Sequence, residues 1–204
     1  IMLVKEKFCR FSLNLNKKFY LLLKILIIYF FFINNAYADL QKELINKITS
    51  IQTLSFNFKQ IIGEKEEIGK CTIKYPLLMK CDYQNLKQKT IISNGKSVAI
   101  IKKKYKKVYL YPVKKTLLFT VLKKEEILGL IRKNKPTKIG SNIIVSGANK
   151  KNKLQIIFDE KSLDIKGWNT LDAYSNNVNF IISDLITNKI IEDKFFKIPR
   201  EEDL

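Results

Sequence analysis

The stretch that decides the fold is GKCTIKYPLLMKCDY, residues 69–83. Residues 71–75 and 79–83 each alternate between apolar and polar side chains, which is the period of a strand with one buried face. Pro76 stands between the two sets, and because proline cannot donate a ladder hydrogen bond it belongs in the connection. These residues therefore predict an antiparallel hairpin.

The alternation continues away from this hairpin in both directions. After residues 91–92, the pair Asn94-Gly95 accepts the positive φ angles of a type I′ turn, so it leads into another strand. Together these stretches predict an antiparallel meander followed by a second run of strands. The further strands are expected at residues 54–58, 97–101, 107–113, 142–147, 153–159, 163–168, 170–174, 178–183 and 195–198.

Two stretches instead have apolar residues every three to four positions, which predicts helices. One follows Asp39, a good N-cap, and the other covers residues 116–131 with a broad apolar side. A sheet of about eleven strands has to curl and to cover its apolar face. We expect a mainly β (α+β) fold, a curled antiparallel sheet or incomplete β-barrel under a helical lid. Periodicity does not distinguish a filled core from a cavity beneath that lid, and composition favours the filled core.

The first 38 residues have the layout of a secretory signal peptide. Basic residues precede nine apolar residues at 25–33, and Ala36-Tyr37-Ala38 is an A-x-A cleavage site. We expect export through Sec and cleavage after Ala38, which leaves residues 39–204 as a single domain. The alternative is an uncleaved anchor that extends back to residue 19, since a membrane span needs roughly 20 apolar residues. Residue 39 is Asp and not Cys, which argues against a lipid anchor at the new N-terminus.

The chain is strongly basic, with a formal net charge of +19, of which the first 38 residues contribute +5. Nucleic-acid binding would concentrate Lys and Arg beside aromatic stacking partners, whereas here lysine is spread through nearly every segment of an exported chain. Attraction to an anionic membrane surface fits that destination better. A third interpretation is that the lysines mainly keep the surface soluble. No nucleic-acid partner is expected.

The chain lacks the residues that several kinds of catalytic, metal-binding and phosphate-binding site require. The chain has no histidine, which removes the commonest general base and metal ligand. Its glycines are scattered, so no phosphate-binding loop is present, and the spacing of its carboxylates suggests no catalytic pair. We therefore expect a protein that is not an enzyme, with no catalytic residue, no metal and no cofactor.

Cys71 and Cys81 are the two cysteines that remain after cleavage. In a hairpin centred on Leu77 they share a face but lie diagonally, at about 7 to 8 Å between Cα atoms. That separation exceeds easy disulfide reach, so we expect two small core residues. A change of register or a bulge would bring the sulfurs together, and an oxidising compartment would then join them.

Four motifs in order resemble the periplasmic outer-membrane lipoprotein carrier family, LolA. They are residues 69–83, the turn at 92–98, the opening strand IQTLSFNFKQ at 51–60, and FKIP at 196–199. The resemblance implies a periplasmic chaperone that shields the acyl chains of lipoproteins and carries them from the inner to the outer membrane. It also implies a monomer whose partners are acylated lipoproteins, an inner-membrane lipoprotein-releasing transporter, and an outer-membrane receptor or the membrane itself.

The resemblance further implies a lipid-binding cavity and a closable lid. Tyr75 stands where the family usually has a basic residue tied to lid closure, and its hydroxyl is expected to bond a lid carbonyl. Cys81 and Ala99 stand where tryptophan is common in the family. Each candidate could equally be a core residue. The lipid-binding candidates are Phe56, Phe58, Met79, Cys81, Tyr83, Leu118, Phe119, Leu122, Ile127, Phe158, Trp168 and Phe180.

Two other functions stay open. A sensor or regulator on the same fold would bind lipid or acylated protein as a signal, and such proteins generally carry a second domain. A membrane-tethered structural protein would keep residues 1–38. An intact N-terminus in purified protein would favour the second of these alternatives.

Overall fold

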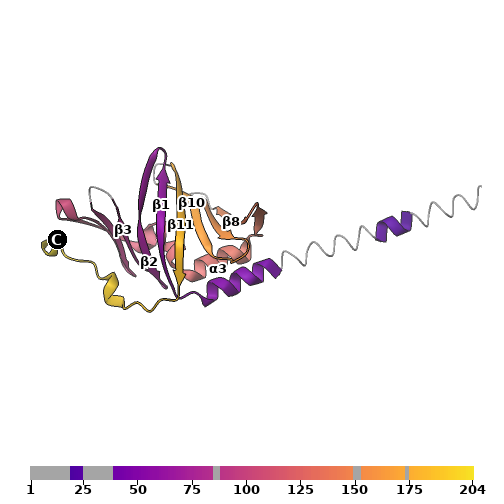
Figure 1. The fold of residues 1–204 in the computed structure, drawn as a ribbon, viewed down its shortest axis with the longest axis horizontal. Coiled ribbons are helices and arrows are strands. Elements are labelled where there is room, and N and C mark those ends of the chain that lie inside the picture. The colour runs from indigo at the N-terminus through magenta and orange to yellow at the C-terminus, as the bar shows by residue number, and fades with distance from the viewer. Residues whose placement is uncertain (1–18, 25–38, 85–87, 149–152, 173–174) are drawn as a thin grey trace, which may run out of the picture. The chain divides into compact units, whose positions relative to one another are not determined.

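The computed structural model describes residues 19–24, 39–84, 88–148, 153–172 and 175–204 (Figure 1). The chain divides into two compact units, Ile1–Leu40 and Gln41–Leu204. In the first unit, the described residues 19–24 and 39–40 are helical. Most of the expected signal peptide, including its cleavage site, lies outside the described residues and stays a prediction. Among the described residues, no helix combines the length and the apolarity that a membrane span requires.

The second unit is built on one antiparallel sheet that contains eleven strands of the described residues, as expected. The strand order is β6-β5-β4-β3-β2-β1-β11-β10-β9-β8-β7, so the curled sheet stays open between its two edges, β6 and β7. The strands are β1 (Thr53–Ile62), β2 (Lys65–Lys74), β3 (Leu78–Tyr83), β4 (Lys89–Asn94), β5 (Ser97–Lys102), β6 (Lys107–Pro112), β7 (Thr137–Ile139), β8 (Asn142–Ala148), β9 (Lys153–Asp159), β10 (Ile165–Leu171) and β11 (Asn177–Thr187).

This strand order explains where the lid lies. The chain leaves the sheet at the edge strand β6 and enters it again at the opposite edge strand β7. The segment between them therefore has to cross one face of the sheet. It carries α2 (Leu118–Leu122) and α3 (Lys124–Lys133), which we call the lid (Figure 1).

The lid is two helices and not the single helix expected at 116–131. Lys123 adopts an extended conformation, with φ −107° and ψ 105°, and separates α2 from α3. The break places Glu125 and Glu126 in the first turn of α3, where acidic side chains interact favourably with the helix dipole. A third helix at residues 41–50 buries Leu44 and Ile48.

The β2–β3 hairpin corrects the expected register. Cys71 lies directly opposite Cys81, and the connection is centred on Pro76, so the centre at Leu77 was wrong. Tyr75-Pro76 is a cis peptide, Leu77 has φ 66°, and Lys74 pairs with Leu78. Because the cysteines are direct cross-strand neighbours, with Cα atoms 4.0 Å apart, they form a disulfide. The expectation of two free thiols was therefore wrong.

The C-terminal segment covers the other face of the sheet. The expected strand at 195–198 is instead a 3-10 helix, η3 (Asp193–Phe196), and Phe196 is buried against Ile92, Ala99 and Ile101. Lys74 Nζ holds this segment by contacts to Asp193 at 2.6 Å and to the Ile191 carbonyl at 2.8 Å. Three short 3-10 helices complete the description, η1 (Lys103–Tyr105), η2 (Val113–Lys115) and η4 (Glu201–Asp203).

Two further strand expectations change. The two strands expected at 163–168 and 170–174 are replaced by one strand, β10 (Ile165–Leu171), whose pairing with β9 shifts between Ile165 and Gly167. Residues 173–174 of the second expectation lie outside the described residues. The short edge strand β7 was not expected, because its three residues are too few to show a period.

Candidate functional site

An apolar cavity of about 630 Å³ lies between the lid and the concave face of the sheet. Its volume falls in the range of about 300–1,000 Å³ that is usual for sites of small organic ligands. Strands β1, β2, β3, β4, β8, β9, β10 and β11 and both lid helices contribute lining residues. They are Gln60, Ile62, Cys71, Met79, Cys81, Tyr83, Ile91, Leu117, Leu118, Thr120, Val121, Glu126, Gly129, Leu130, Lys133, Asn134, Gly147, Leu154, Trp168, Thr170, Leu171, Asp172, Val178 and Phe180.

Stacked aromatic rings form one wall of this cavity. The rings of Trp168 and Phe180 stack with centroids 4.2 Å apart, and Phe58 stacks on Phe180 at 4.9 Å. Tyr83 meets Phe58 edge to face at 4.8 Å. Gly69 lies opposite Phe58, and a Cβ there would overlap the Phe58 ring and the Asp82 carbonyl oxygen. The absent side chain therefore lets the aromatic rings pack across β2.

Two hydrogen-bonded polar side chains, Tyr83 and Gln60, interrupt the apolar wall. The Tyr83 hydroxyl donates to Gln60 Oε1 at 2.8 Å. Burial raises the pKa of Tyr83, and the nearby Glu67 carboxylate raises it further. Behind the ring, Lys89 Nζ lies 3.6 Å from the Tyr83 ring centroid and 2.5 Å from a Glu67 carboxylate oxygen.

Polar lining residues gather on α3 and at the end of β10. Glu126, Lys133 and Asn134 line the cavity from α3 and its C-cap, and Asp172 lines it just beyond β10. Lys123 pairs with Glu126 at 3.1 Å. The cavity therefore suits a ligand with a long apolar part and a polar end.

Among the described residues, few hydrogen bonds tie the lid to its surroundings. The N–H of Leu77, in the β2–β3 connection, donates to the Leu122 carbonyl at the end of α2 at 2.8 Å. Gln41 Nε2 donates to the Ile131 carbonyl at 2.5 Å, and Lys124 Nζ to the Thr49 carbonyl at 3.2 Å. Gln41 Nε2 also donates to the Arg132 carbonyl at 3.2 Å. These four bonds join the lid to its surroundings, so they would have to break or rearrange when it moves.

Tyr75 does not make the hydrogen bond expected of it. Among the described residues its hydroxyl has no hydrogen-bond partner, and burial raises its pKa. The Lys124 ammonium lies 5.5 Å from the Tyr75 ring centroid, so the ring still meets the lid through a cation–π contact. The backbone of Leu77 makes the bond to the lid carbonyl instead. The Leu77 N–H faces the lid from the connection between β2 and β3.

The structure brings together half of the expected lipid-binding residues. Met79, Cys81, Tyr83, Leu118, Trp168 and Phe180 line the cavity. Phe56 and Phe58 pack against Phe180 in the aromatic wall without lining the cavity. Leu122, Ile127 and Phe158 are fully buried and Phe119 is half-buried, and none of these four lines it. Contact of any of the twelve with lipid stays a prediction.

The lining residues that sequence reasoning missed are mostly polar, small or partly exposed. Gln60 and Thr170 occupy inward positions that usually hold apolar residues, and Gly129 and Gly147 have no side chain to attract attention. Leu154 and Val178 follow the alternation of their strands, so the same period that identified Phe180 could have found them. Cys71 was recognised as a neighbour of Cys81 but was not counted among the lipid-binding candidates.

A curled, open antiparallel sheet with a helical lid over an apolar cavity defines the fold class of this chain, an unclosed barrel with a lid. The sequence model for the outer membrane lipoprotein carrier protein LolA matches residues 49–199. The chain therefore belongs to the LolA family.

The solved structures that resemble this chain have very low sequence identity to it. An uncharacterised conserved protein from Thermus thermophilus is 7% identical, with 79% of this chain and 94% of that chain covered and a TM-score of 0.50. A LolA superfamily protein from Nitrosomonas europaea is 8% identical, with coverage of 77% and 97% and a TM-score of 0.43. A chain of the Pseudomonas aeruginosa MucA/MucB complex is 9% identical, with coverage of 79% and 62% and a TM-score of 0.48. No curated protein matches the sequence significantly.

Proposed function

We propose that this chain is a periplasmic chaperone that encloses the acyl chains of lipoproteins and carries them from the inner to the outer membrane. The observation that carries the proposal is the cavity of about 630 Å³, which joins an apolar wall to a polar group of residues on α3. Membership of the LolA family supports the same function. No step of it requires a catalytic residue or a cofactor.

The energetics of the cargo explain why a cavity is needed. Burying an acyl chain of about fourteen methylenes is worth roughly 11 kcal/mol, at about 0.8 kcal/mol each. Without a shield, such a chain would stay in the membrane or aggregate. An apolar cavity offers an interior of comparable affinity, and it lets the cargo cross an aqueous compartment.

Release requires that this affinity can be lowered. A lid that closes more favourably over an empty cavity than over a filled one reduces the affinity by that difference in free energy. In the part of the chain that the structure describes, the lid is tied to the hairpin and to the helix at 41–50 by a small number of hydrogen bonds, such as that between Leu77 and Leu122. Opening therefore breaks few bonds, which suits a carrier that must load and unload.

The proposal includes the partners and the location. Processing after Ala38 would deliver residues 39–204 to the periplasm as one domain. There the chain would receive acylated lipoproteins from an inner-membrane transporter and would pass them to an outer-membrane receptor or to the membrane. N-terminal analysis of periplasmic protein tests the processing step, and recovery only with residues 19–33 attached, in the membrane fraction, would contradict it.

A release assay tests the function. Purified protein is added to spheroplasts, and lipoproteins that appear in the supernatant are measured. The wild-type chain is expected to release them. Met79→Glu places a carboxylate in the cavity wall, where a charge beside an acyl chain is costly, and is expected to release none.

Two further variants control this experiment. Met79 is buried, so Leu118→Glu is tested beside it, because Leu118 lines the cavity from the half-buried surface of α2. Ile190→Glu makes the same kind of change at a side chain that is 96% exposed, and it should leave release unchanged. Full release by a folded Leu118→Glu or Met79→Glu protein would overturn the proposed function.

A further inference from the structure

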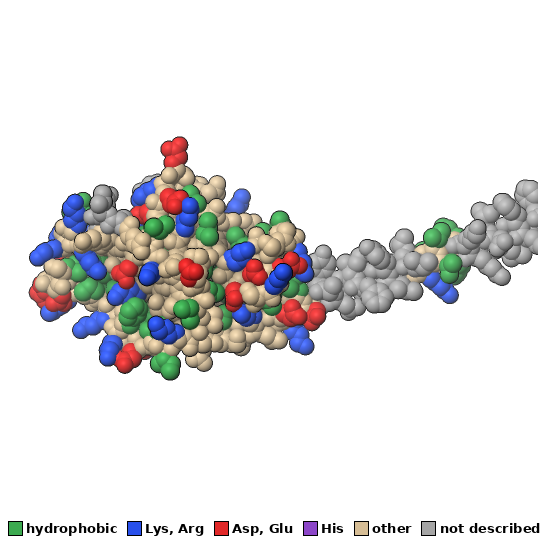
Figure 2. Space-filling view, in the orientation of Figure 1, with side chains coloured by type: hydrophobic (Ala, Val, Ile, Leu, Met, Phe, Trp, Pro, Cys, Tyr) green, Lys and Arg blue, Asp and Glu red, His purple; other side chains and the backbone are tan. Residues whose placement is uncertain are grey.

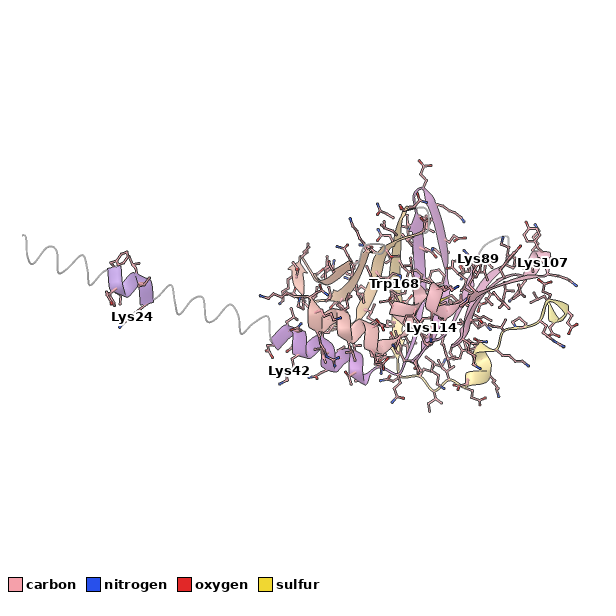
Figure 3. All side chains as sticks on the ribbon, turned by 180° about the vertical axis from the view of Figure 1, so that it is seen from behind. Lys24, Lys42, Lys89, Lys107, Lys114 and Trp168 are labelled. Atoms are coloured by element: carbon pink, nitrogen blue, oxygen red, sulfur yellow. A yellow bond between two sulfur atoms is a disulfide. The ribbon has the colours of Figure 1, made fainter. Side chains whose placement is uncertain are left out.

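One edge of the sheet combines lysines with exposed tyrosines. The segment KKKYKKVYLYPVKK, residues 102–115, holds seven lysines and no acidic residue. It covers the end of β5, η1, the edge strand β6 and η2, and we call it the lysine–tyrosine edge. Figure 3 labels Lys107 at the outer end of this edge and Lys114 closer to the lid. On the face seen in Figure 2, basic and acidic side chains are interspersed.

Large apolar side chains are exposed along the same edge. Tyr105, Tyr109, Leu110 and Tyr111 are 52%, 43%, 61% and 46% exposed. Since side chains alternate along a strand, Tyr109 and Tyr111 lie on the cavity face of β6 and Leu110 lies on the opposite face. A flat partner that meets the edge head-on would contact side chains of both faces at once.

The edge is poorly suited to strand addition. The N–H of Val108 already donates to Glu201 Oε1 at 2.9 Å, so it points away from β5. Alternate residues of an antiparallel strand direct their N–H groups to the same side, which adds Leu110 and Pro112 to the outward set. Pro112 has no N–H, and proline and lysine on an edge strand both discourage pairing with another chain. Lys107 pairs with Glu201 at 3.3 Å, and a second copy of this edge would still bring its other six lysines against their counterparts.

A row of neighbouring side chains connects this edge to the cavity. Cys81 lies opposite Ile91, Ile91 opposite Ile100, and Ile100 opposite Tyr109. These partners share the concave face, because directly opposed residues of an antiparallel pair point to the same side of the sheet. Exposure rises along the row, from the buried Cys81 through the half-buried isoleucines to the exposed Tyr109. An apolar path therefore runs from the cavity wall to the edge.

We propose that the lysine–tyrosine edge docks on the surface of an anionic lipid bilayer. Lysines close to such a surface gain about 1 kcal/mol each, and tyrosines favour the interface, where the ring is partly buried and the hydroxyl meets water. Edge-on docking would place the end of the apolar row at the lipid surface. The inference goes beyond the proposed carrier function, and binding to a vesicle needs no cargo, so either can fail without the other.

Vesicle flotation tests this docking. The chain as recovered from cells is mixed with vesicles of phosphatidylcholine alone, or of phosphatidylcholine with about one third phosphatidylglycerol. Binding is expected only to the anionic vesicles, and it should be lost at about 0.5 M salt, where charges are screened within a few ångströms. The triple variant Lys103→Glu, Lys104→Glu and Lys114→Glu should bind on the order of 100-fold more weakly.

A second triple variant provides the matched control. Lys135→Glu, Lys153→Glu and Lys161→Glu change the net charge equally, at exposed lysines in the other half of the sheet. This control should bind within about threefold of wild type. Residues 1–38 are the same in the wild type and in both triple variants, so their contribution to binding is common to all three proteins. Equal weakening of both triple variants would show that only net charge matters and would overturn the proposal. So would absence of vesicle binding, or dimerisation that only the edge variant abolishes.

Discussion

Gly69 carries no side chain, and the aromatic wall of the cavity depends on that. The Phe58 ring lies across it, with Tyr83 on one side and Phe180 on the other. At this scale Met79, Cys81, Tyr83 and Phe180 were among the lipid-binding candidates expected from the sequence, and all four line the cavity. The sequence missed Gln60, because a polar residue at an inward position is indistinguishable in sequence from an outward one until its partner, the Tyr83 hydroxyl, is known.

Gly69→Ala is expected to destabilise the fold by about 1–3 kcal/mol, because the new methyl group overlaps the Phe58 ring and the Asp82 carbonyl. Gly129→Ala is the matched control, since nothing lies within 4 Å of a Cβ there and alanine favours the helix by about 1 kcal/mol. Urea unfolding monitored by circular dichroism measures both. Equal stability of the two variants would contradict the close packing at Gly69.

Glu67 makes the free energy of unfolding depend on pH in the acidic range. Burial alone would raise the pKa of Glu67, but the hydrogen bonds and charges of Lys89 and Lys65 outweigh it and hold this pKa below its usual value of 4.5. The ionised carboxylate therefore stabilises the folded state above pH 4.5, and this contribution is lost as the pH falls through the lowered folded pKa. Glu67→Gln should lower the free energy of unfolding by about 1–3 kcal/mol at pH 7, a difference that shrinks below pH 4.5. If the free energies of unfolding of wild type and Glu67→Gln differ by the same amount from pH 7 to pH 3, ionised Glu67 does not stabilise the fold.

At the scale of elements, the β2–β3 hairpin and the lid define the cavity together. The sequence predicted both strands of the hairpin but not their register. A connection centred on Pro76 and one centred on Leu77 fit the same residues, and the backbone conformation decides between the two. The sequence likewise predicted the apolar stripe of the lid but not its break at Lys123, since two helices in succession keep the same apolar spacing. The disulfide follows from the register and was missed with it.

Removal of the disulfide by Cys71→Ser with Cys81→Ser is expected to lower the free energy of unfolding by about 2–4 kcal/mol, because the bond restricts the unfolded chain. A reducing agent should have the same effect on the wild-type chain and none on the double variant. Thiol titration of the unfolded, unreduced protein checks the bond itself. Two reactive thiols in addition to any from Cys9 would contradict it.

Gly147 of β8 lies against the Leu130 side chain of α3. A Cβ at this position would overlap Leu130 Cδ1, so Gly147→Val should displace the Leu130 side chain and loosen the packing of the lid on β8. We expect a bound acyl chain to leave about tenfold faster, as measured by stopped-flow fluorescence, since such overlaps cost about 1–3 kcal/mol. Adding Leu130→Ala should restore slow release, because it removes the atom that is overlapped. Faster release that Leu130→Ala fails to rescue would argue against this cause.

At the scale of the whole molecule, strand order creates the site. The chain leaves one edge of an open sheet and returns at the other, so its connection has to lie across a face. The sequence predicted about eleven strands and a helical cover but not this order, because the pairing of β1 with β11 joins residues far apart in the chain. It also could not separate a filled core from a cavity, since the same inward residues serve both.

The most direct test of the central claim uses Trp168, which is the chain's only tryptophan and lines the cavity. Its fluorescence is followed while a lipopeptide with brominated acyl chains is added, because bromine quenches tryptophan only at close range. The account predicts saturable quenching, reversed by an unlabelled acyl lipopeptide and absent in a folded Leu118→Glu protein. Unquenched Trp168 fluorescence in folded wild-type protein, with lipopeptide present up to its solubility limit, would contradict the account.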